Sequence, residues 1–394
     1  MKVLLLGVGM QGKAALRDLA LNSHVDEILT ADKDIEGLKS YVAEAGFGDK
    51  VQCKHFDAED AAQMKGLMSE DVQVVIDLLP IQFTNQAAKM AVEQGIHLVN
   101  TMRVTPEIEA LAKEAKAKGI TILPEFGLDP GIDLLLLGKA VRDFESLTEI
   151  WSYGSGIPEP DVADNPLRYK VTWTFEGVLF TYTRPAKIIQ GGEVISIPGT
   201  DLFHPENVHM VTLEDFGSLE AFPSGDALPF AEQAGIDITK LDELGRYTLR
   251  YPGHCQFWRA MVDMHLLDDE PVILDGVAVD RRRFLAACME PQLQLGPKER
   301  DVTILRVEVA GVRNGEKMNG VYQLIDYRDL KTGLTAMSRT VGYTASIGAI
   351  LLGTSQLSKR GLLSPVSDVP YEVVMKELAD RGIQASEQFT PLVD

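Results

Sequence analysis

Short apolar runs alternate with helix-like segments through about the first 125 residues of the chain. Six of these runs are strand candidates: residues 3–6, 27–31, 51–56, 72–78, 97–100 and 121–123. Before the last run lies a helical segment, 106–118, with Thr105 as its N-cap, Pro106 at its first position and Gly119 at its end. Strands that alternate with helices in this way predict an α/β fold with a doubly wound, parallel sheet of the Rossmann type.

The pattern changes after residue 126. Gly, Pro and aromatic residues become frequent from 151 to about 250, where helical periodicity is lost. Strand candidates in the rest of the chain are 171–175, 180–183, 303–310 and 320–326. They predict a second, mixed α+β domain with antiparallel pairing.

Helical periodicity returns near Thr344, and we expect the segment that follows to pack back onto the first domain. The expected division is therefore 1–127 with 344–394 for the first domain, and 128–343 for the second.

The first apolar run leads directly into a glycine-rich loop. Gly7, Gly9 and Gly12 have the GxGxxG spacing, with Met10 and Gln11 between them, and a helix-forming run follows. In such loops the first glycine permits a tight turn, the second lets the backbone approach a pyrophosphate, and the third lets helix and strand pack closely. The helix N-terminus offers free N–H groups to phosphates. The loop therefore predicts a dinucleotide site; the alternative is a tight strand-to-helix turn without a ligand.

Polar residues at the ends of the next strands bear on the cofactor. Asp32 ends the second apolar run, where a carboxylate accepts hydrogen bonds from the adenosine ribose and repels a 2′-phosphate. It favours NAD over NADP, although Lys33 follows directly; the alternative is a strand-end Asp that caps a turn. Asp57 follows the third strand, where the adenine is expected; alternatively it initiates a turn. Ligands of open α/β sheets bind outside the carboxyl ends of the strands. This rule adds four residues to the expected cofactor site, with plain loop residues as the alternative: Leu79, Pro80, Thr101 and Met102.

Charge and cysteine content narrow the class of protein. The formal net charge of −20 argues against nucleic acid as a partner, because phosphates would be repelled. No apolar run approaches the roughly 18 residues of a membrane span. Cys53, Cys255 and Cys288 have no paired spacing, so we expect neither disulfides nor a metal site. These features favour a cytoplasmic protein.

Longer motifs resemble the saccharopine dehydrogenase family, which also contains lysine 6-dehydrogenases. The matching segments are 75–80, 101–106, 125–133, 156–160, 163–170 and 340–345. The resemblance is weak between about 192 and 240. It implies a Rossmann domain, a second domain that supplies substrate and dimer contacts, and usually a homodimer. It also implies an enzyme that uses a nicotinamide cofactor to oxidise or reduce a C–N centre of an amino acid.

Segment 125–133 is the main candidate for the active site. The resemblance places Asp129 there as the candidate catalytic residue, because a carboxylate can bind a substrate ammonium or accept its proton. The structural alternative makes Asp129 the N-cap of a helix, Pro130 its first residue and Asp133 a residue one turn further on.

Other polar side chains are candidates for substrate contacts. Arg103 could clamp a carboxylate or pair with a neighbouring acid. His254 is either an acid–base residue or a structural histidine. The expected substrate-binding set is Arg103, Glu125, Asn165, Tyr169, Arg250 and His254.

One departure from the family bears on the substrate. Saccharopine-reducing members place an arginine in the turn that matches residues 222–226, and this chain has none there. We therefore expect NAD-dependent oxidation of L-lysine or a lysine-derived amine, with hydride transfer to the cofactor and release of ammonia. The alternative is a saccharopine dehydrogenase that releases glutamate. Further alternatives are a Rossmann dehydrogenase for an opine, polyamine or hydroxy acid, and a cofactor-binding sensor without catalysis.

Overall fold

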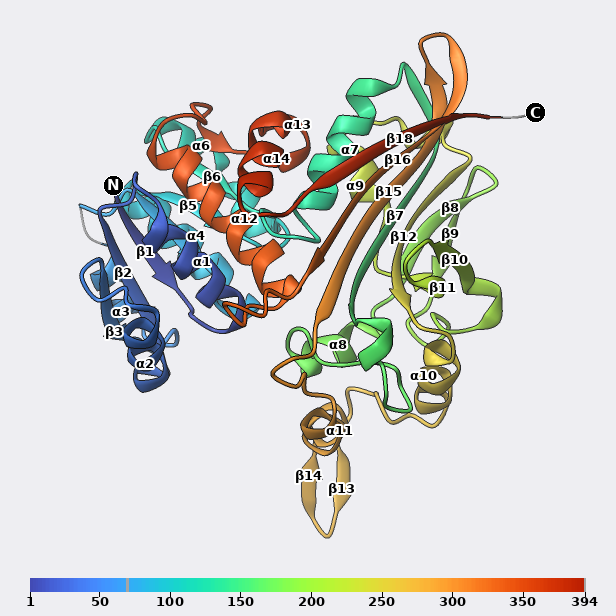
Figure 1. Cartoon of the computed structure of the whole chain (residues 1–394), viewed down its shortest axis with the longest axis horizontal. Helices are drawn as coiled ribbons and strands as arrows, with labels where there is room; N and C mark the ends of the chain where they lie inside the picture. Colours follow the sequence, from blue (N-terminus) through green and yellow to red (C-terminus); the bar gives the residue numbers. More distant parts are fainter. Residues whose placement is uncertain (69–70, 393–394) are drawn as a thin grey trace. The chain divides into compact units, whose positions relative to one another are not determined.

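The computed structural model describes residues 1–68 and 71–392 and divides the chain into two compact units. Unit 1 contains Met1–Gly138 and Ser338–Ile383, and unit 2 contains Lys139–Met337 and the segment that starts at Gln384 (Figure 1). The chain therefore changes unit at 138/139, 337/338 and 383/384, whereas the sequence pattern suggested 127/128 and 343/344.

Unit 1 is built on a seven-stranded sheet in the order β17-β6-β5-β4-β1-β2-β3. All its pairings are parallel, and the order reverses beside β1, so the predicted doubly wound Rossmann sheet is confirmed. The strands are β1 (Lys2–Leu6), β2 (Glu27–Asp32), β3 (Val51–His55), β4 (Val74–Asp77), β5 (His97–Asn100), β6 (Thr121–Leu123) and β17 (Gly361–Leu362).

Helices accompany this sheet. They are α1 (Met10–Leu21), α2 (Ile35–Ala45), α3 (Ala61–Leu67), α4 (Thr84–Gln94), α5 (Pro106–Ala110), α6 (Ala112–Ala117), α13 (Pro365–Asp368) and α14 (Tyr371–Asp380). Thr105 caps α5 as predicted, because its Oγ1 accepts a hydrogen bond of 3.2 Å from Ile108 N. The predicted single helix over 106–118 is instead two short helices that meet at Leu111.

Two longer helices, α7 (Ile132–Asp143) and α12 (Ala336–Gly353), each contain a boundary between the units. From Ser338 onward α12 belongs to unit 1 and packs against α1, since a Cβ at Gly342 would collide with the carbonyl oxygen of Gln11. Figure 1 shows the orange and red helices α12 and α14 beside the blue elements of unit 1, although they come from opposite ends of the chain. Arg381, just after α14, binds Asp18 of α1 through Nε–Oδ1 at 2.6 Å.

The last strand departs from the prediction that 344–394 belongs to the first domain. β18 (Ala385–Pro391) pairs antiparallel with β16 (Glu316–Tyr327) in unit 2. Helical structure in the predicted segment 344–394 therefore ends at α14. The strand that follows, β18, adds to the sheet of unit 2.

Unit 2 contains a nine-stranded, mixed sheet. Its main path runs β10-β11-β12-β7-β15-β16-β18; β8 pairs with β12, and β9 pairs with β8. The strands not yet introduced are β7 (Ser146–Pro158), β8 (Ala186–Gln190), β9 (Glu193–Ile197), β10 (His209–Leu213), β11 (Gly217–Pro223), β12 (Glu243–Arg250) and β15 (Asp301–Arg313). β12 and β7 run parallel, and the predicted antiparallel pair near 303–326 is confirmed as β15 and β16.

The remaining elements of unit 2 lie outside this sheet. They are α8 (Phe175–Thr181), α9 (Leu228–Gln233), α10 (His254–Asp263), α11 (Arg281–Met289) and a separate two-stranded sheet of β13 (Val272–Leu274) and β14 (Val277–Val279). The prediction of strands at 171–175 and 180–183 is wrong: 171–174 lie in no strand, α8 covers 175–181, and 182–183 form a turn. Phe175, Val178 and Leu179 of α8 are buried, and their i, i+3, i+4 spacing presents one helical face to the core, so tertiary packing outweighs their β propensity.

Within the described part of the chain, no helix has the length and apolar character needed to cross a membrane.

Candidate functional site

In the glycine loop of unit 1, the backbone geometry requires glycine at two positions, Gly7 and Gly12. Gly7 has φ 85°, in the left-handed region, and a Cβ there would lie 2.7 Å from the carbonyl oxygen of Leu78. A Cβ at Gly12 would collide with the Gly7 carbonyl oxygen. Gly9 differs from both, because a Cβ there would meet no atom within 4 Å. The open side at Gly9 is therefore the place where a pyrophosphate can approach, and Met10 begins α1 directly behind it.

Asp32 is engaged by the backbone. Its Oδ2 accepts a hydrogen bond of 2.6 Å from Val8 N in the glycine loop, and its Oδ1 accepts one of 2.8 Å from Asp34 N. The carboxylate thus fastens the end of β2 to the loop. Lys33, the next residue, has a side chain that is 75% exposed, and its Nζ lies 3.4 Å from Asp57 Oδ2. The end of β2 therefore carries an exposed cation beside an engaged carboxylate.

Asp57 initiates a turn, which is the structural alternative given by the sequence analysis. Its Oδ1 accepts a hydrogen bond of 3.2 Å from Glu59 N, and this bond, with the charge of Lys33, lowers the pKa of the Asp57 carboxyl. The same half-exposed carboxylate forms an ion pair with Lys33.

Two polar residues at the ends of neighbouring strands were not predicted. Asp77 of β4 and Asn100 of β5 face each other in register, and each accepts a backbone N–H two residues on, from Leu79 and Met102 respectively, at 3.1 Å. The second polar atom of each, Asp77 Oδ2 and Asn100 Nδ2, is buried without a hydrogen-bond partner. Burial raises the pKa of Asp77 to about 7. The signal available in the sequence was a polar residue at the carboxyl end of each strand, directly after two or more apolar residues.

Segment 125–133 runs along this carboxyl edge. Glu125 is buried with φ 55°, and its N–H donates to Met102 O at 3.0 Å. A Cβ at Gly127 would lie 3.0 Å from Thr101 Cβ, so the loop that carries Asp129 starts against Thr101. Unit 1 therefore brings together several predicted residues from separate parts of the sequence: Leu79, Pro80, Thr101, Met102, Arg103, Glu125 and Asp129.

The helical interpretation of Asp129 and Pro130 is wrong. α7 begins at Ile132, and Asp133 lies in its first turn rather than one turn further on. The buried Asp133 carboxylate accepts a 2.7 Å hydrogen bond from Gly131 N. Asp129 is exposed, outside the helix. Its carboxylate is therefore accessible to a ligand, and its role in catalysis stays a prediction.

In unit 2 the structure gathers three of the predicted substrate residues into one buried cluster. The Arg250 guanidinium lies 5.0 Å from the centre of the Tyr169 ring, and the His254 ring lies 5.8 Å from it. Tyr182, which the sequence analysis did not select, hydrogen-bonds through its hydroxyl to His254 Nε2 at 2.8 Å. Asn165 shapes the adjoining turn, because its Nδ2 donates to Tyr169 O at 2.7 Å.

The electrostatics of this cluster favour an anionic ligand. Burial and the Arg250 charge lower the pKa of His254 well below its ordinary value of 6.5, so the imidazole is neutral near pH 7. Among residues 1–68 and 71–392, Arg250 forms no ion pair with a carboxylate, and its Nη1 donates to Leu249 O at 2.9 Å. Arg250 Nε, His254 Nδ1 and the Tyr169 hydroxyl are buried without hydrogen-bond partners. A buried cation and unsatisfied polar atoms are costly, and a carboxylate would satisfy them.

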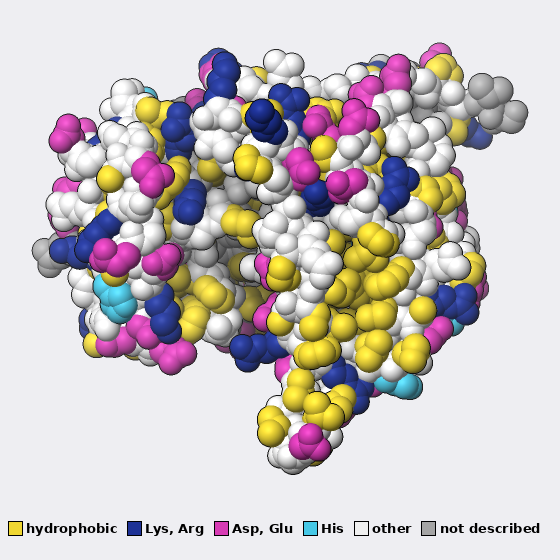
Figure 2. All heavy atoms as spheres, turned by 60° about the horizontal axis from the view of Figure 1, so that its bottom comes forward, with side chains coloured by type: hydrophobic (Ala, Val, Ile, Leu, Met, Phe, Trp, Pro, Cys, Tyr) yellow, Lys and Arg dark blue, Asp and Glu magenta, His cyan; other side chains and the backbone are white. Residues whose placement is uncertain are grey.

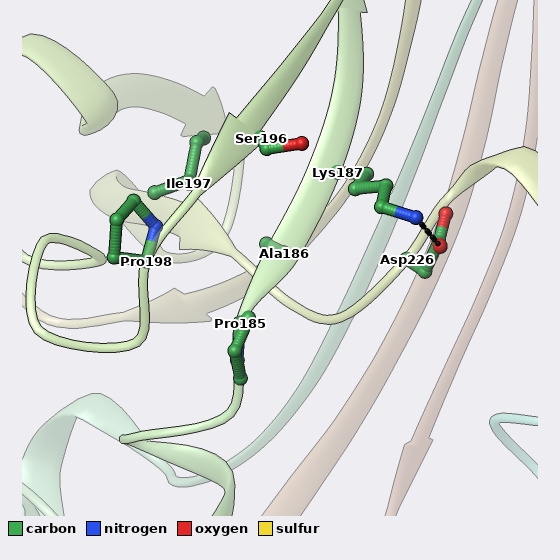
Figure 3. A pocket seen from close by; sticks show the side chains of 7 residues that line it. All are labelled: Pro185, Ala186, Lys187, Ser196, Ile197, Pro198 and Asp226. Atoms are coloured by element: carbon green, nitrogen blue, oxygen red, sulfur yellow. Dashed lines mark ion pairs between the residues drawn. The ribbon is translucent and has the colours of Figure 1, made fainter.

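The turn 222–226 contains no arginine, but the side chain of Arg184, from another segment, lies against it. A Cβ at Gly225 would lie 2.9 Å from Nη2 of Arg184, which follows α8. Ser224 N donates to the carbonyl of the buried Arg246 at 2.8 Å. Beside the turn is a pocket of about 290 Å³, drawn in Figure 3, where Lys187 and Asp226 point toward each other and pair at 3.1 Å.

Comparison with known proteins gives consistent results for both units. The family model described as "Saccharopine dehydrogenase NADP binding domain" matches residues 3–123, and "Saccharopine dehydrogenase C-terminal domain" matches 127–383. The chain is 26% identical to the saccharopine dehydrogenase (NADP(+), L-glutamate-forming) of Pyricularia oryzae over 98% of both chains. A solved structure, the apo histidine-tagged saccharopine dehydrogenase (L-Glu forming) from Saccharomyces cerevisiae, superposes with a TM-score of 0.86, 25% identity and 99% coverage of both chains.

Other relatives are longer. The chain is 26% identical to the mitochondrial alpha-aminoadipic semialdehyde synthase of Rattus norvegicus over 99% of its own length, but it covers only 48% of the rat protein. It covers 38% of the corresponding synthase of Arabidopsis thaliana.

Proposed function

Because the chain belongs to the saccharopine dehydrogenase family, an oxidoreductase family, we propose that it is a saccharopine dehydrogenase of the glutamate-forming type. In the oxidative direction, the carbon of the lysine moiety that bears the bridging nitrogen loses a hydride to the nicotinamide. Water adds to the resulting imine, and the C–N bond breaks to give L-glutamate and an amino acid aldehyde. This is the alternative of the sequence analysis, and it replaces L-lysine oxidation as the favoured reaction.

The observation that carries this proposal is the buried guanidinium of Arg250 without a carboxylate partner among the described residues. Saccharopine has three carboxylates, and the planar guanidinium suits them because it donates two parallel hydrogen bonds. The Tyr169 hydroxyl and His254 Nδ1 add polar atoms to the same cluster. The Arg250 cluster supports a site for one carboxylate of the substrate.

Arg184 removes the sequence argument against saccharopine. That argument rested on the missing arginine in the turn 222–226, but the Arg184 guanidinium lies against Gly225 of that turn. Because Gly225 has no side chain, the Arg184 guanidinium can occupy the space beside it. We assign Arg184 to a second substrate carboxylate.

For the cofactor we propose NADP rather than NAD. The family model and the fungal relative are both named for NADP. The two Asp32 oxygens accept backbone N–H groups, so this carboxylate holds the loop, whereas the exposed Lys33 offers an ammonium for the 2′-phosphate. When bound, NADP supplies the hydride acceptor; the open backbone at Gly9 and the N-terminus of α1 hold its pyrophosphate.

The carboxylate of Asp129 is our candidate for the proton acceptor at the bridging nitrogen. It is exposed and lies in a loop anchored at Thr101, at the carboxyl edge of the unit 1 sheet.

A product assay tests the reaction. The purified protein is incubated with NADP and saccharopine, and separately with NAD or NADP and L-lysine, while absorbance of the reduced cofactor, glutamate and ammonia are measured. We expect reduced cofactor and equimolar glutamate from saccharopine, and no ammonia from L-lysine. Ammonia from L-lysine without glutamate from saccharopine would overturn the proposal.

A further inference from the structure

Tyr182 contacts several aromatic rings in the buried cluster of unit 2. It follows α8 directly, is 1% exposed, and its ring centre lies 4.9, 5.3 and 5.8 Å from those of Trp258, Phe203 and Phe222. Such close packing fixes the ring and with it the position of the hydroxyl oxygen. The hydroxyl hydrogen-bonds to His254 Nε2 at 2.8 Å. A single polar atom is therefore held in place inside an aromatic cluster.

The outer side of the elements that carry this pair is apolar as well. Figure 2 shows hydrophobic side chains over a broad area beside the projecting hairpin of β13 and β14. Exposed hydrophobic residues of unit 2 include Phe180 of α8, two positions before Tyr182, and Phe257 of α10, the helix that begins at His254. Apolar surroundings keep the local dielectric constant low, and a hydrogen bond there is stronger than in water. The bond between Tyr182 and His254 is therefore strong enough to select one protonation form.

Arg250 determines the direction of this hydrogen bond. Burial raises the pKa of the Tyr182 hydroxyl, whereas the charge of Arg250 and a hydrogen bond with its guanidinium oppose the rise. A guanidinium has donors only, so the Tyr182 oxygen accepts from Arg250. In the part of the chain that the structure describes, His254 Nε2 is the one side-chain acceptor that the hydroxyl reaches. The O–H of Tyr182 therefore donates to Nε2.

This direction determines where the proton of His254 lies. The imidazole is neutral near pH 7, because burial and the Arg250 charge lower its pKa. In a neutral imidazole one nitrogen accepts and the other carries the proton. Since Nε2 accepts from Tyr182, the proton lies on Nδ1, which has no hydrogen-bond partner within the described residues. The Leu167 carbonyl, which partly offsets the lowering of this pKa, can only accept and is compatible with a proton on Nδ1.

We propose that Tyr182 is a positioning residue, which orients Arg250 and fixes His254 as the Nδ1–H tautomer so that both donate to one substrate carboxylate. The inference rests on the proposed function, which assigns a carboxylate of the substrate to this cluster. With Nδ1 protonated, the guanidinium and the imidazole both offer N–H donors to the same anion. The other tautomer would present the lone pair of Nδ1, which repels a carboxylate. A phenylalanine in place of Tyr182 would remove both constraints.

NMR spectroscopy of the full chain, labelled with nitrogen-15 in its histidine rings, tests the tautomer without a substrate. The chain has seven histidines, and His254→Asn identifies the signals of His254 by their loss. We expect one wild-type form near pH 7, with Nδ1 protonated and Nε2 unprotonated. Tyr182→Phe should give a mixture of the two tautomers. A proton on Nε2 in the wild type, or an unchanged single form in a folded Tyr182→Phe variant, overturns the proposal.

Steady-state kinetics tests the effect on the substrate. Tyr182→Phe should raise KM for saccharopine about tenfold, change kcat less than about twofold and leave KM for NADP unaltered, because it weakens a contact made equally in the ground state and the transition state. In an Arg250→Gln background the same change should raise KM by less than about twofold, since Tyr182 acts through Arg250. An equal, tenfold increase in both backgrounds would mean that Tyr182 acts on the fold instead, and overturns the proposal.

Tyr322→Phe is the matched control. It also removes a buried hydroxyl with a hydrogen bond of 2.8 Å, to Asp143 Oδ2, but Tyr322 lies in β16, outside the cluster. It should leave the His254 signals and KM for saccharopine as in wild type, and circular dichroism checks that each variant is folded. The NMR measurement also separates this proposal from the proposed function. Failure of the wild type to oxidise saccharopine, with His254 in the expected tautomer, overturns the proposed function and supports the arrangement of Tyr182 and His254.

Discussion

Asp77 links the stability of unit 1 to pH. Its carboxyl is fully buried, and its pKa rises from 3.8 to about 7 on folding. Between these values the folded chain retains a proton that the unfolded chain releases, so stability falls as pH rises from about 4 to about 7 and stays lower above it. Asp77→Asn removes this ionisation. From pH 5 to pH 8, the free energy of unfolding should fall by about 2–3 kcal/mol less in the variant than in wild type.

Urea unfolding at the two pH values measures this difference. The matched control is Asp49→Asn, because Asp49 is exposed and should follow wild type. Equal pH dependence in Asp77→Asn and wild type would mean that Asp77 is already ionised in the folded protein.

Lys33 is the second residue with a specific expectation. If its ammonium binds the 2′-phosphate, Lys33→Ala should raise KM for NADP tenfold or more, about 1.4 kcal/mol, and leave KM for NAD nearly unchanged. Lys39→Ala on α2, whose partner is Glu36, is the matched control and should alter neither. Steady-state kinetics with both cofactors provides the measurement. A wild-type enzyme that prefers NAD would restore the prediction based on Asp32.

Arg184 distinguishes the two substrates. Arg184→Gln should raise KM for saccharopine about tenfold, or about 1.4 kcal/mol, with cofactor affinity unchanged, because one substrate carboxylate loses its guanidinium. Arg259→Gln on α10, a half-exposed residue near Asp263, is the control and should match wild type. Initial rates against saccharopine concentration decide the result, and unchanged saccharopine kinetics in a folded Arg184→Gln would remove Arg184 from the site.

Prediction from sequence succeeded where a local rule dictates a residue. Gly7 and Gly12 were predictable because the backbone leaves no room for a Cβ at either position. The pairing of Tyr182 with His254 was not, because the two residues are 72 positions apart and only the fold of unit 2 brings them together. Asp77 and Asn100 were missed for a similar reason: a sequence does not reveal which buried polar atoms will lack a partner.

At the scale of elements, α12 depends on one glycine. A Cβ at Gly342 would collide with Gln11 O and lie 2.8 Å from Ala14 Cβ, so Gly342→Ala forces α12 away from α1. We expect a loss of about 1–3 kcal/mol in stability, the usual range for overpacking. Dinucleotide affinity should fall as well, because Gln11 belongs to the glycine loop. Urea unfolding and cofactor titration measure the two effects.

Gly66→Ala in α3 is the matched control. No atom lies within 4 Å of a Cβ at Gly66, so alanine should be neutral or stabilise the helix by about 0.4–1 kcal/mol. If the two variants had equal stability, close packing at Gly342 would not be what holds α12 on α1.

Elements were predicted best where their burial follows a single period. The central parallel strands of unit 1, β1 and β4, are nearly continuous apolar runs, as expected for strands covered on both faces, and all six N-terminal strands were found, including the polar edge strand β3. α8 was mistaken for strands because Thr, Val, Phe and Tyr have high β propensity, and its helical burial becomes visible only in the packed unit.

At the scale of the whole molecule, unit 1 needs both of its segments. α12 buries a continuous set of apolar residues within unit 1, including Ile347, Ile350 and Leu351, and Arg381 binds Asp18. A fragment of residues 1–138 should therefore be largely unfolded. A separate fragment of residues 336–383 added in trans should restore structure and cofactor binding. Circular dichroism and cofactor titration of the two fragments, alone and mixed, test this expectation, and a folded 1–138 fragment would contradict it.

The three changes of unit along the chain set an order of events during synthesis. A ribosome makes the glycine loop before α12, which begins more than 300 residues further along the chain, and β18, the edge strand of the other unit, follows later still. Neither unit can reach its final packing before these late elements have been made. The proposed cofactor site, although most of its residues precede α12 by more than 200 positions, is therefore completed only after α12 has been made, and the nascent chain must keep its uncovered apolar surfaces from aggregating until then.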